Sequence, residues 1–303
     1  MENVCCIFCK DETTTPYREE NGYQAVQCSG CGLVFVNPRP SIEEMKQLYE
    51  GQETKINLSA HLLKRDLKSI QARKNLSVLR KYCASGRLLE VGSAAGYFLW
   101  EAKKAGFDVQ GVDLTHQFVE FSKTVLQVPS FEGTMKEVPF EAESFDAVFM
   151  RNLLSHMAYP LDEFRNLNRL LKKEGILVLE TGNAAELTPE QAGFLELPDH
   201  LYHFSEKTIV RLLEDSGFEW VATHRFSLLS EMHFVKKLEA LFQRPKAGAT
   251  GPKKPLQIPT SLPASKLGAR LTAHAGQFIR YDLGRVLPKE GHRCTLVMVG
   301  RKR

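Results

Sequence analysis

The sequence predicts an α/β protein with a doubly wound, mostly parallel sheet and a small N-terminal cysteine-rich module. From Arg87 onward, strand-like apolar runs alternate with helix-like segments, which is the pattern of a parallel sheet covered on both faces. The run at 88–92 enters a turn of small residues, and an acid, Asp113, closes the next run. Two Cys-x-x-Cys pairs lie near the N-terminus and indicate a separate module.

Length and composition are those of an ordinary globular protein. The chain has 303 residues, of which 43% are apolar and 25% charged, enough for one large domain with a buried core plus a smaller module. No apolar run approaches the ~20 residues of a membrane span, and the N-terminus lacks a signal-peptide pattern. Five of the seven cysteines fall in the first 31 residues, which favours metal ligation in a reducing compartment. We therefore expect a cytoplasmic protein.

Charge is divided unevenly along the chain. Residues 1–235 carry 25 Lys and Arg against 33 Asp and Glu, whereas residues 236–303 carry 15 against 3, a net charge of +12. A basic C-terminal segment favours an anionic partner, such as a phosphorylated small molecule, an anionic lipid surface or nucleic acid. A solvated basic surface is the alternative interpretation.

The N-terminal module carries a metal-site pattern. Cys6 and Cys9 form one pair, Cys28 and Cys31 form the other, and 18 residues separate the pairs. Four thiolates at this spacing are typical of a structural zinc site, which leaves no open coordination position for catalysis. Cys5 could replace Cys6 in the first pair, and four free buried thiols remain the alternative.

The rest of the N-terminal part is expected to form a zinc ribbon and a helical linker. Alternating apolar residues indicate the ribbon strands: Tyr23, Val26, Leu33 and Phe35. After Pro40, Ser41 and Glu44 match a capping box that starts a helix, and residues 59–82 have a helical apolar period. We expect a ribbon over 1–40, a helical linker over 41–84 and a large domain over 85–303 with a basic insertion at about 227–292.

The large domain alternates strands and helices. Strand-like runs cover 88–92, 108–113, 145–150 and 176–180, and helical patterns cover 97–105, 115–127, 161–172 and 206–216. Gly175 is expected to end the third helix, and Ser205 is a good N-cap for the fourth. Ligands of such sheets lie at the carboxyl ends of the strands. The candidate site segments are therefore 92–97, 113–115, 133–135, 151–159 and 181–204.

The small-residue turn indicates an adenosine site. Residues 88–98 are LLEVGSAAGYF, and Asp113 follows Gly92 by 21 residues. Such a turn lets the backbone approach a ligand, while the carboxylate accepts hydrogen bonds from both ribose hydroxyls. A nicotinamide dinucleotide site would need G-x-G-x-x-G, and this turn, G-x-A-x-G, better fits a cofactor without phosphates.

An ordered set of segments carries a family resemblance. These segments are CGLVFVNPRP (31–40), LLEVGSAAGYF (88–98), GVDL (111–114), FDAVFMRNLLSH (145–156), LLKKEGILVLETGN (170–183) and HLYHF (200–204). The chain resembles the class I S-adenosylmethionine-dependent methyltransferases, and most closely a bacterial subgroup with an N-terminal zinc ribbon. The resemblance implies a seven-stranded Rossmann-like sheet and S-adenosyl-L-methionine as the cofactor. It also implies that 218–226 and 294–302 form an antiparallel pair, with the insertion between them leaving from the substrate side.

The resemblance also implies cofactor-binding residues: Glu90, Gly92, Ser93, Ala94, Gly96, Tyr97, Asp113, Leu114, Thr134, Arg151 and Asn152. Asp113 would bind the ribose, Leu114 would cover the adenine, and Arg151 and Asn152 would flank the sulfonium. Three positions depart from the family pattern. Ala94 replaces the middle glycine, which fits if its φ is negative. Thr134 replaces an acid that often binds adenine, and Ser155 replaces a Glu that commonly precedes the family histidine.

Methyl transfer from a sulfonium is an in-line displacement, so positioning supplies much of the rate. A base helps when the nucleophile is a hydroxyl or an enolisable carbon. The catalytic candidates are His156, His200, His203 and Tyr202. His156 follows a core strand and could instead be a packing histidine, while His200 and His203 lie where a loop normally closes over the substrate.

The expected function is methyl transfer to a small, anionic acceptor, such as an activated sugar, a glycan or a lipid-linked intermediate. The basic insertion on the substrate side motivates this expectation, and its amphipathic stretch (232–242) is either packing or a membrane-surface contact. One alternative is an RNA methyltransferase whose ribbon reads RNA, although the ribbon itself is not basic. The other is a non-catalytic module with a degenerate cofactor pocket.

Overall fold

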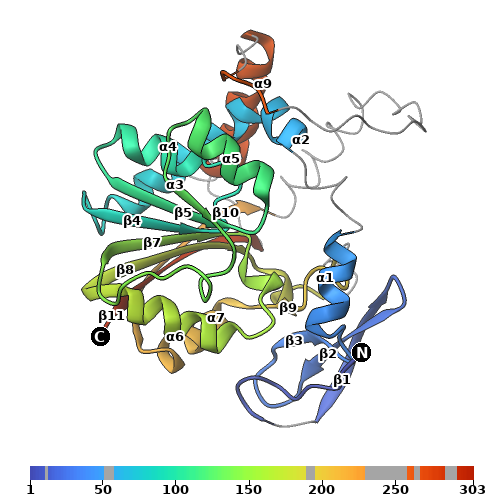
Figure 1. Ribbon diagram of the computed structural model, residues 1–303. Helices are drawn as coiled ribbons and strands as arrows, with labels where there is room; N and C mark the ends of the chain where they lie inside the picture. The colour runs from blue at the N-terminus through green and yellow to red at the C-terminus, as the bar shows by residue number, and fades with distance from the viewer. Residues whose placement is uncertain (11–12, 51–57, 189–194, 229–257, 263–266, 284–291) are drawn as a thin grey trace.

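The computed structural model describes residues 1–303 except 11–12, 51–57, 189–194, 229–257, 263–266 and 284–291. The described residues form a seven-stranded sheet with helices on both faces and a four-stranded sheet beside it (Figure 1). The expected amphipathic stretch 232–242 and most of the proline-rich part of the insertion lie outside the described residues. Among the helices that are described, none combines the length and the apolar character that crossing a membrane requires.

The large sheet has the strand order β10-β11-β8-β7-β4-β5-β6. Its strands are β4 (Arg87–Val91), β5 (Asp108–Asp113), β6 (Ser130–Glu132), β7 (Phe145–Arg151), β8 (Leu171–Gly182), β10 (Phe218–Leu228) and β11 (Arg293–Lys302). β11 pairs antiparallel with both β8 and β10, and the other pairings are parallel. The predicted mostly parallel sheet and its antiparallel final pair are therefore confirmed.

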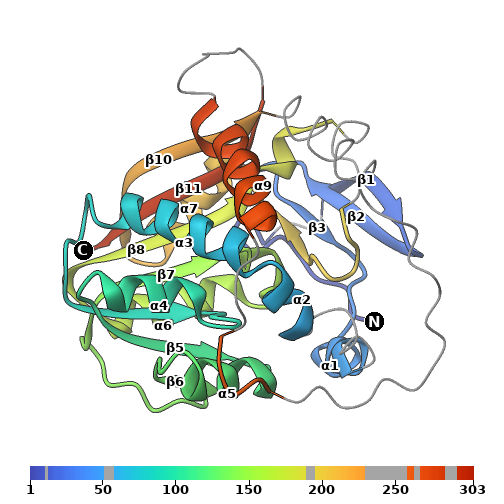
Figure 2. The same ribbon diagram turned by 90° about the horizontal axis from the view of Figure 1, so that it is seen from above.

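Helices cover both faces of this sheet (Figures 1 and 2). One face carries α2 (Leu58–Leu63), α3 (Arg65–Leu79), α4 (Tyr97–Lys104), α5 (His116–Thr124), α9 (Leu267–Gln277) and the π-helical turn η3 (Phe278–Asp282). The other face carries α6 (Pro160–Leu170) and α7 (Glu206–Asp215). Two 3₁₀ turns, η1 (Leu154–His156) and η2 (Ala184–Glu186), follow β7 and β8.

Two expected helices end differently in the structure. The helix expected over 161–172 ends at Leu170, because Leu171 already pairs with Phe145 of β7. Gly175 therefore lies inside β8 instead of ending a helix, at a bend where a Cβ would come within 2.8 Å of a backbone carbonyl. The helix expected over 59–82 is two helices, α2 and α3, separated at Lys64.

Both predicted helix caps are present. Ser205 caps α7 and forms a reciprocal capping box with Thr208. At the start of α1 (Ile42–Glu50), the Glu44 N–H donates to Ser41 Oγ (3.2 Å) and the Ser41 N–H donates to Glu44 Oε2 (2.8 Å). These caps fix where the two helices begin.

The N-terminal sheet has the order β1-β2-β3-β9, formed by β1 (Thr14–Glu20), β2 (Tyr23–Cys28), β3 (Val34–Val36) and β9 (Tyr202–His203). β1 and β2 are joined by Asn21 and Gly22, whose φ values of 55° and 78° match the twist of a tight hairpin. β9 comes from the large domain, so the ribbon takes its fourth strand from the segment that was expected to contact the substrate. Ribbon residues Leu33 and Phe35 consequently share one buried core with Phe164 of α6 and Ile209 of α7.

A buried carboxylate ties helix α3 and the insertion to the sheet. Glu180 of β8 is 3% exposed and accepts hydrogen bonds from Gln71 Nε2 (3.1 Å), Tyr281 OH (3.2 Å) and Asn75 Nδ2. Arg151 Nε of β7 lies 3.4 Å from the same carboxylate. Each donor offsets part of the cost of burying the charge, so the described end of the insertion is fixed against the sheet.

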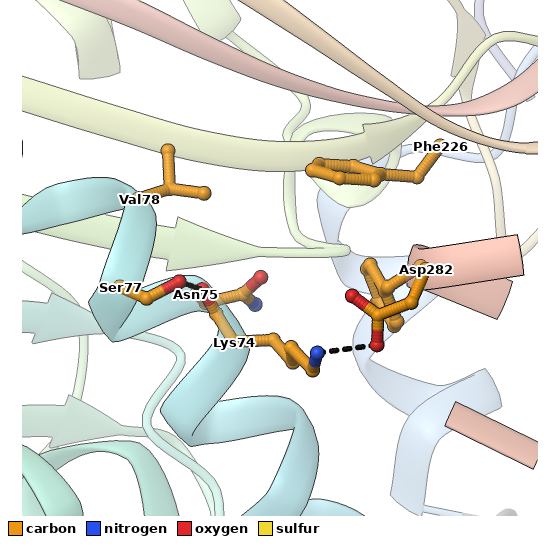
Figure 3. Close-up of a pocket in the computed structure, with 7 residues that line it drawn as sticks. Lys74, Asn75, Ser77, Val78, Phe226 and Asp282 are labelled. Carbon is orange, nitrogen blue, oxygen red and sulfur yellow. Dashed lines mark hydrogen bonds and ion pairs between the residues drawn. The ribbon is translucent and has the colours of Figure 1, made fainter. Parts of the chain in front are cut away.

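Beside this network lies a pocket of about 50 Å³ (Figure 3). It is lined by Lys74, Asn75, Ser77, Val78, Phe226, Tyr281 and Asp282, and an ion pair joins Lys74 to Asp282 within it. Small-molecule sites usually enclose several hundred Å³, so this pocket is too small for an adenosine-containing cofactor.

Candidate active site and zinc site

The turn after β4 is held against β5 by its backbone. The N–H groups of Gly92 and Ser93 both donate to the Val112 carbonyl, at 2.9 and 3.1 Å. Gly96 has a φ of 77°, and a Cβ there would lie 2.4 Å from Ser122 Oγ of α5. Only glycine fits at that point, so the turn can pack closely against the neighbouring helix.

Asp113 closes the turn with both carboxylate oxygens. Its Oδ2 accepts the Ala94 N–H at 2.7 Å, and its Oδ1 accepts the Thr115 N–H at 2.9 Å. Burial raises the pKa of Asp113, while these backbone donors oppose the shift. Each oxygen keeps further acceptor capacity, so the carboxylate can hold the turn and still receive a pair of hydroxyl groups.

Ala94 does not have the negative φ that would make it an easy replacement for glycine. Its φ is 45°, in the left-handed region that costs residues with a Cβ on the order of 1–2 kcal/mol. The reason is the bond from its N–H to Asp113, which requires the backbone to turn toward β5 at this residue. The turn therefore keeps a glycine-like conformation without the glycine.

Several buried polar atoms around the turn have no hydrogen-bond partner among the described residues. They are Glu90 Oε2, Ser93 Oγ and Tyr97 OH, on side chains that are 4–5% exposed. Burial raises the pKa of Glu90 well above its ordinary value. Since buried polar groups are normally paired, this corner fits a ligand that brings its own donors and acceptors, as the amino-acid end of S-adenosylmethionine does.

Two basic residues that the sequence reasoning missed lie near this corner, His61 of α2 and Lys68 of α3. Burial, followed by the charges of Arg151 and Lys64, lowers the pKa of Lys68 to about 8, and its ammonium group forms no hydrogen bond or ion pair with another described residue. Burial likewise lowers the pKa of His61 to about 3, and its ring lies 4.4 Å from that of Phe118. In the sequence, the basic side chains at 61, 64 and 68 recur at helical spacing, and this pattern could have pointed to His61 and Lys68.

The remaining expected cofactor residues lie around the same strand ends. Leu114 is 69% exposed at the end of β5, and Thr134 already donates its N–H to Glu137 Oε2 at 2.6 Å. Asn152 has a φ of 48° and donates its N–H to the Glu180 carbonyl. Arg151 lies in ion-pair contact with Glu180, so its charge is already balanced on that side.

The three candidate histidines come together. The ring of His156 in η1 lies 4.6 Å from that of His200, which lies 5.9 Å from that of His203 in β9. His156 Nδ1 is 2.9 Å from the Asp199 carbonyl and 3.4 Å from Asp199 Oδ1. Because a carbonyl only accepts, Nδ1 is the nitrogen that donates here, and Nε2 is the acceptor nitrogen of the ring. A carboxylate, which the family pattern has at the position of Ser155, is thus provided beside His156 by Asp199, 43 residues after the histidine.

Burial keeps two of these histidines neutral. It lowers the pKa of His200, aided by the charge of His156, and lowers that of His203 to about 3. His203 Nε2 is buried without a hydrogen-bond partner among the described residues. Tyr202 faces the ribbon instead: its OH contacts Arg39 Nη1 (3.0 Å) and the Ala158 carbonyl. Burial raises the pKa of Tyr202 to about 12, which makes it a poor base.

The four predicted zinc ligands converge. The sulfur atoms of Cys6, Cys9, Cys28 and Cys31 all lie within 4.8 Å of one another, and Cys5 is outside this group. Burial raises the pKa of Cys6 and of Cys31, so these thiols ionise together only if a cation compensates them. The donor set fits a tetrahedral structural zinc ion.

Comparison with known proteins supports the methyltransferase interpretation of this site. A family model described as a methyltransferase domain matches residues 61–223. A tRNA U34 carboxymethyltransferase of Ectopseudomonas mendocina is 29% identical over 144 residues, which are 44% of this chain and 45% of that protein. The corresponding protein of Stutzerimonas stutzeri is 34% identical over 32% of this chain and 33% of its own length. The chain therefore spans between a third and a half of these relatives.

Solved structures share the fold. A geranyl diphosphate methyltransferase in complex with SAM superposes with a TM-score of 0.52 at 16% identity, covering 78% of this chain and 85% of that one. A SAM-dependent methyltransferase from Archaeoglobus fulgidus gives 0.50 at 16% identity, covering 78% and 94%. At such identities the likeness concerns the fold alone, and it confirms the expected Rossmann-like methyltransferase architecture.

The strained alanine gives a stability prediction. Ala94→Gly should raise the free energy of unfolding by about 0.5–1 kcal/mol, because relief of the positive φ exceeds the added flexibility of the unfolded chain. Urea unfolding followed by circular dichroism measures the change. Ala95→Gly, at a neighbouring position that is 1% exposed and lacks a positive φ, should destabilise by a similar amount. Destabilisation by Ala94→Gly would contradict the strain.

The buried histidine predicts a pH dependence of stability. His203 stays neutral in the folded protein down to about pH 3, whereas the unfolded chain binds a proton below about pH 6.5. Stability should therefore fall as the pH drops below 6.5, and this residue should account for about 1.4 kcal/mol at pH 5.5. His203→Phe should remove that part of the loss, seen as a smaller difference between urea midpoints at pH 7.5 and 5.5. An equal difference in both proteins would refute the assignment.

Proposed function

The chain belongs to the methyltransferase domain family, and we propose that it transfers the methyl group of S-adenosylmethionine to an acceptor bound beside His156 and His200. The turn that Asp113 closes carries this proposal, because unpartnered polar atoms of Glu90, Ser93 and Tyr97 surround it. A corner with these features suits an adenosine attached to a zwitterionic amino acid better than it suits a phosphate-bearing cofactor.

Each part of the cofactor has a residue of suitable chemistry. The Asp113 carboxylate would accept both ribose hydroxyls, and exposed Leu114 would cover the adenine. Glu90 would receive the ammonium group, and Lys68, partly buried and without an ion pair to a described residue, would bind the carboxylate. When bound, the cofactor supplies a methyl group on a cationic sulfur. The chain's task is then to orient an acceptor and to remove its proton.

His156 is the proposed base. Its Nδ1 proton is held by the Asp199 carbonyl, which leaves Nε2 as the proton acceptor. The Asp199 carboxylate, 3.4 Å from the same ring, would stabilise the imidazolium that forms. His200 is neutral and 4.6 Å from His156, so it can bind the acceptor without repelling the new charge. Acceptors with a hydroxyl, an N–H or an enolisable carbon fit this arrangement.

The four convergent cysteines are proposed to hold one structural zinc ion in a ribbon over residues 1–40. Residues 41–84 would act as a helical linker and 85–303 as the methyltransferase domain. In that domain, the insertion of about 227–292 leaves from β10, which runs parallel to the core strands. Its charge supports a small anionic acceptor, since residues 227–292 carry 11 Lys and Arg against 4 Asp and Glu, a net +7.

RNA is the second candidate acceptor. The relatives of Ectopseudomonas and Stutzerimonas bear the name tRNA U34 carboxymethyltransferase, and the basic C-terminal segment would suit phosphates. The matched part covers less than half of each relative, so the acceptor does not follow from the likeness. We rank RNA behind a small molecule because the ribbon is acidic and is engaged with the large domain.

Cofactor binding can be tested without knowing the acceptor. Calorimetric titration should show that the protein binds S-adenosylmethionine and that Asp113→Ala weakens binding by about 100-fold, the loss of two charge-assisted hydrogen bonds. Asp108→Ala on the same strand is the control, because the Asp108 side chain is 74% exposed. Absence of binding by the unaltered protein would refute the proposed function.

The acceptor class can be tested by label transfer. The protein is incubated with S-adenosylmethionine carrying a radioactive methyl group and with either a small-molecule extract or total RNA. Label should enter the small-molecule fraction and drop by about 100-fold with His156→Asn, which leaves cofactor binding intact. Label entering RNA would instead select the second candidate.

A further inference from the structure

One ribbon carboxylate binds three consecutive backbone N–H groups of the large domain. Glu20 Oε2 accepts the Leu195 N–H at 2.9 Å, and Glu20 Oε1 accepts the Glu196 and Leu197 N–H groups at 2.8 and 3.2 Å. The Glu20 side chain is 10% exposed. Charge-assisted bonds to backbone donors are among the stronger hydrogen bonds in proteins, and three of them on successive residues fix both the place and the direction of a segment.

The ribbon hairpin adds contacts on either side of this carboxylate. Asn21 Nδ2, in the β1–β2 turn, donates to the Leu197 carbonyl at 2.8 Å, and Tyr17 OH of β1 donates to the Leu187 carbonyl at 2.7 Å. Leu195 and Leu197 are each 2% exposed, and they pack in a cluster with ribbon residues Ala25, Val34 and Val36. The segment is therefore held by both polar and apolar contacts with the ribbon.

The same segment then runs into the histidine cluster. We call residues 195–203 the histidine segment. Its last two residues form β9 against β3, and the Val36 N–H donates to the Leu201 carbonyl at 3.0 Å. The Leu201 N–H donates in the opposite direction to the Ser155 carbonyl, at 2.8 Å. The segment thus lies between the ribbon and the turn that carries His156.

We propose that Glu20 is a positioning residue of the methyl-transfer site, and that the ribbon is a working part of that site because it places His200 against His156. Glu20 touches neither cofactor nor acceptor, since its oxygens are bonded to the backbone of the histidine segment. The hydrogen bonds by which Glu20 places the histidine segment are observed in the structure. Their role in catalysis rests on the proposed function.

The physical reason lies in the spacing along the segment. Leu197, whose N–H is bound by Glu20, is two residues before Asp199 and three before His200. Movement of the segment by one residue's length would carry Asp199 away from His156 Nδ1 and separate the two histidine rings. Misplacement of about 1 Å can cost an enzyme 100-fold in rate. A fixed carboxylate at the ribbon tip prevents this movement.

The test compares Glu20→Ala and Glu20→Gln with Glu19→Ala, an exposed carboxylate on the same strand. Hydrogen exchange by mass spectrometry reports on residues 195–203, and proton NMR follows the titration of the His200 ring, assigned with His200→Asn. Glu20→Ala should speed exchange across the segment by at least about tenfold and should move the pKa of His200 up toward its ordinary value as burial is lost. Glu20→Gln, which keeps one acceptor oxygen, should give a smaller change, and Glu19→Ala none.

Zinc content and S-adenosylmethionine binding should stay unchanged in all three variants, because neither the thiols nor the Asp113 corner contacts Glu20. Unchanged exchange and an unchanged His200 titration in Glu20→Ala would overturn the proposal. If Glu20→Ala does not fold, Glu20→Gln decides by the same two measurements. Failure of the unaltered protein to bind S-adenosylmethionine would overturn the proposed function but would leave these readouts valid.

Discussion

The pairing of β3 with β9 is the constraint on which the arrangement of this protein depends. It is only two residues long on the β9 side, yet it joins a sheet that begins at residue 14 to a segment beyond residue 195. So short a pair is not stable by itself. It persists because buried side chains of the ribbon and of α6 and α7 form one core around it. The ribbon and the large domain are therefore expected to keep their relative position only while the core that they share is intact.

The two corners of the proposed site differ in their electrostatics: one holds charged groups of both signs and the other holds neutral rings. The cofactor corner holds buried Glu90 and partly buried Lys68 and Asp113, groups of both signs whose pKa values are shifted mainly by desolvation. Such a corner gains most from a ligand that carries both charges. The histidine corner holds neutral rings, since burial lowers the pKa of His200 and of His203. The cationic methyl donor of the proposed function would thus meet no repulsion from His200 or His203.

The sequence predicted those features that depend on local pattern. Buried parallel strands are continuous apolar runs, and paired cysteines have ligand spacing, so the sheet, the two helix caps and the cysteine group could be expected. Asp199 and Glu20 could not, because their partners lie 43 and about 175 residues away and depend on how the chain returns to the ribbon. The positive φ at Ala94 could not be expected for a related reason. A side chain from the next strand, Asp113, sets that backbone conformation.

The placement of the ribbon also bears on what the ribbon does. Residues 1–40 hold three basic side chains, Lys10, Arg18 and Arg39, against five acidic ones. Arg39 is 4% exposed and donates to Glu2, Ala158 and Tyr202, and Arg18 lies 4.0 Å from Glu20. Recognition of nucleic acid needs cations that are free to meet phosphates. Because two of the three are engaged in internal contacts, and the hairpin tip binds the histidine segment, the ribbon is better suited to shaping the proposed acceptor site than to reading RNA.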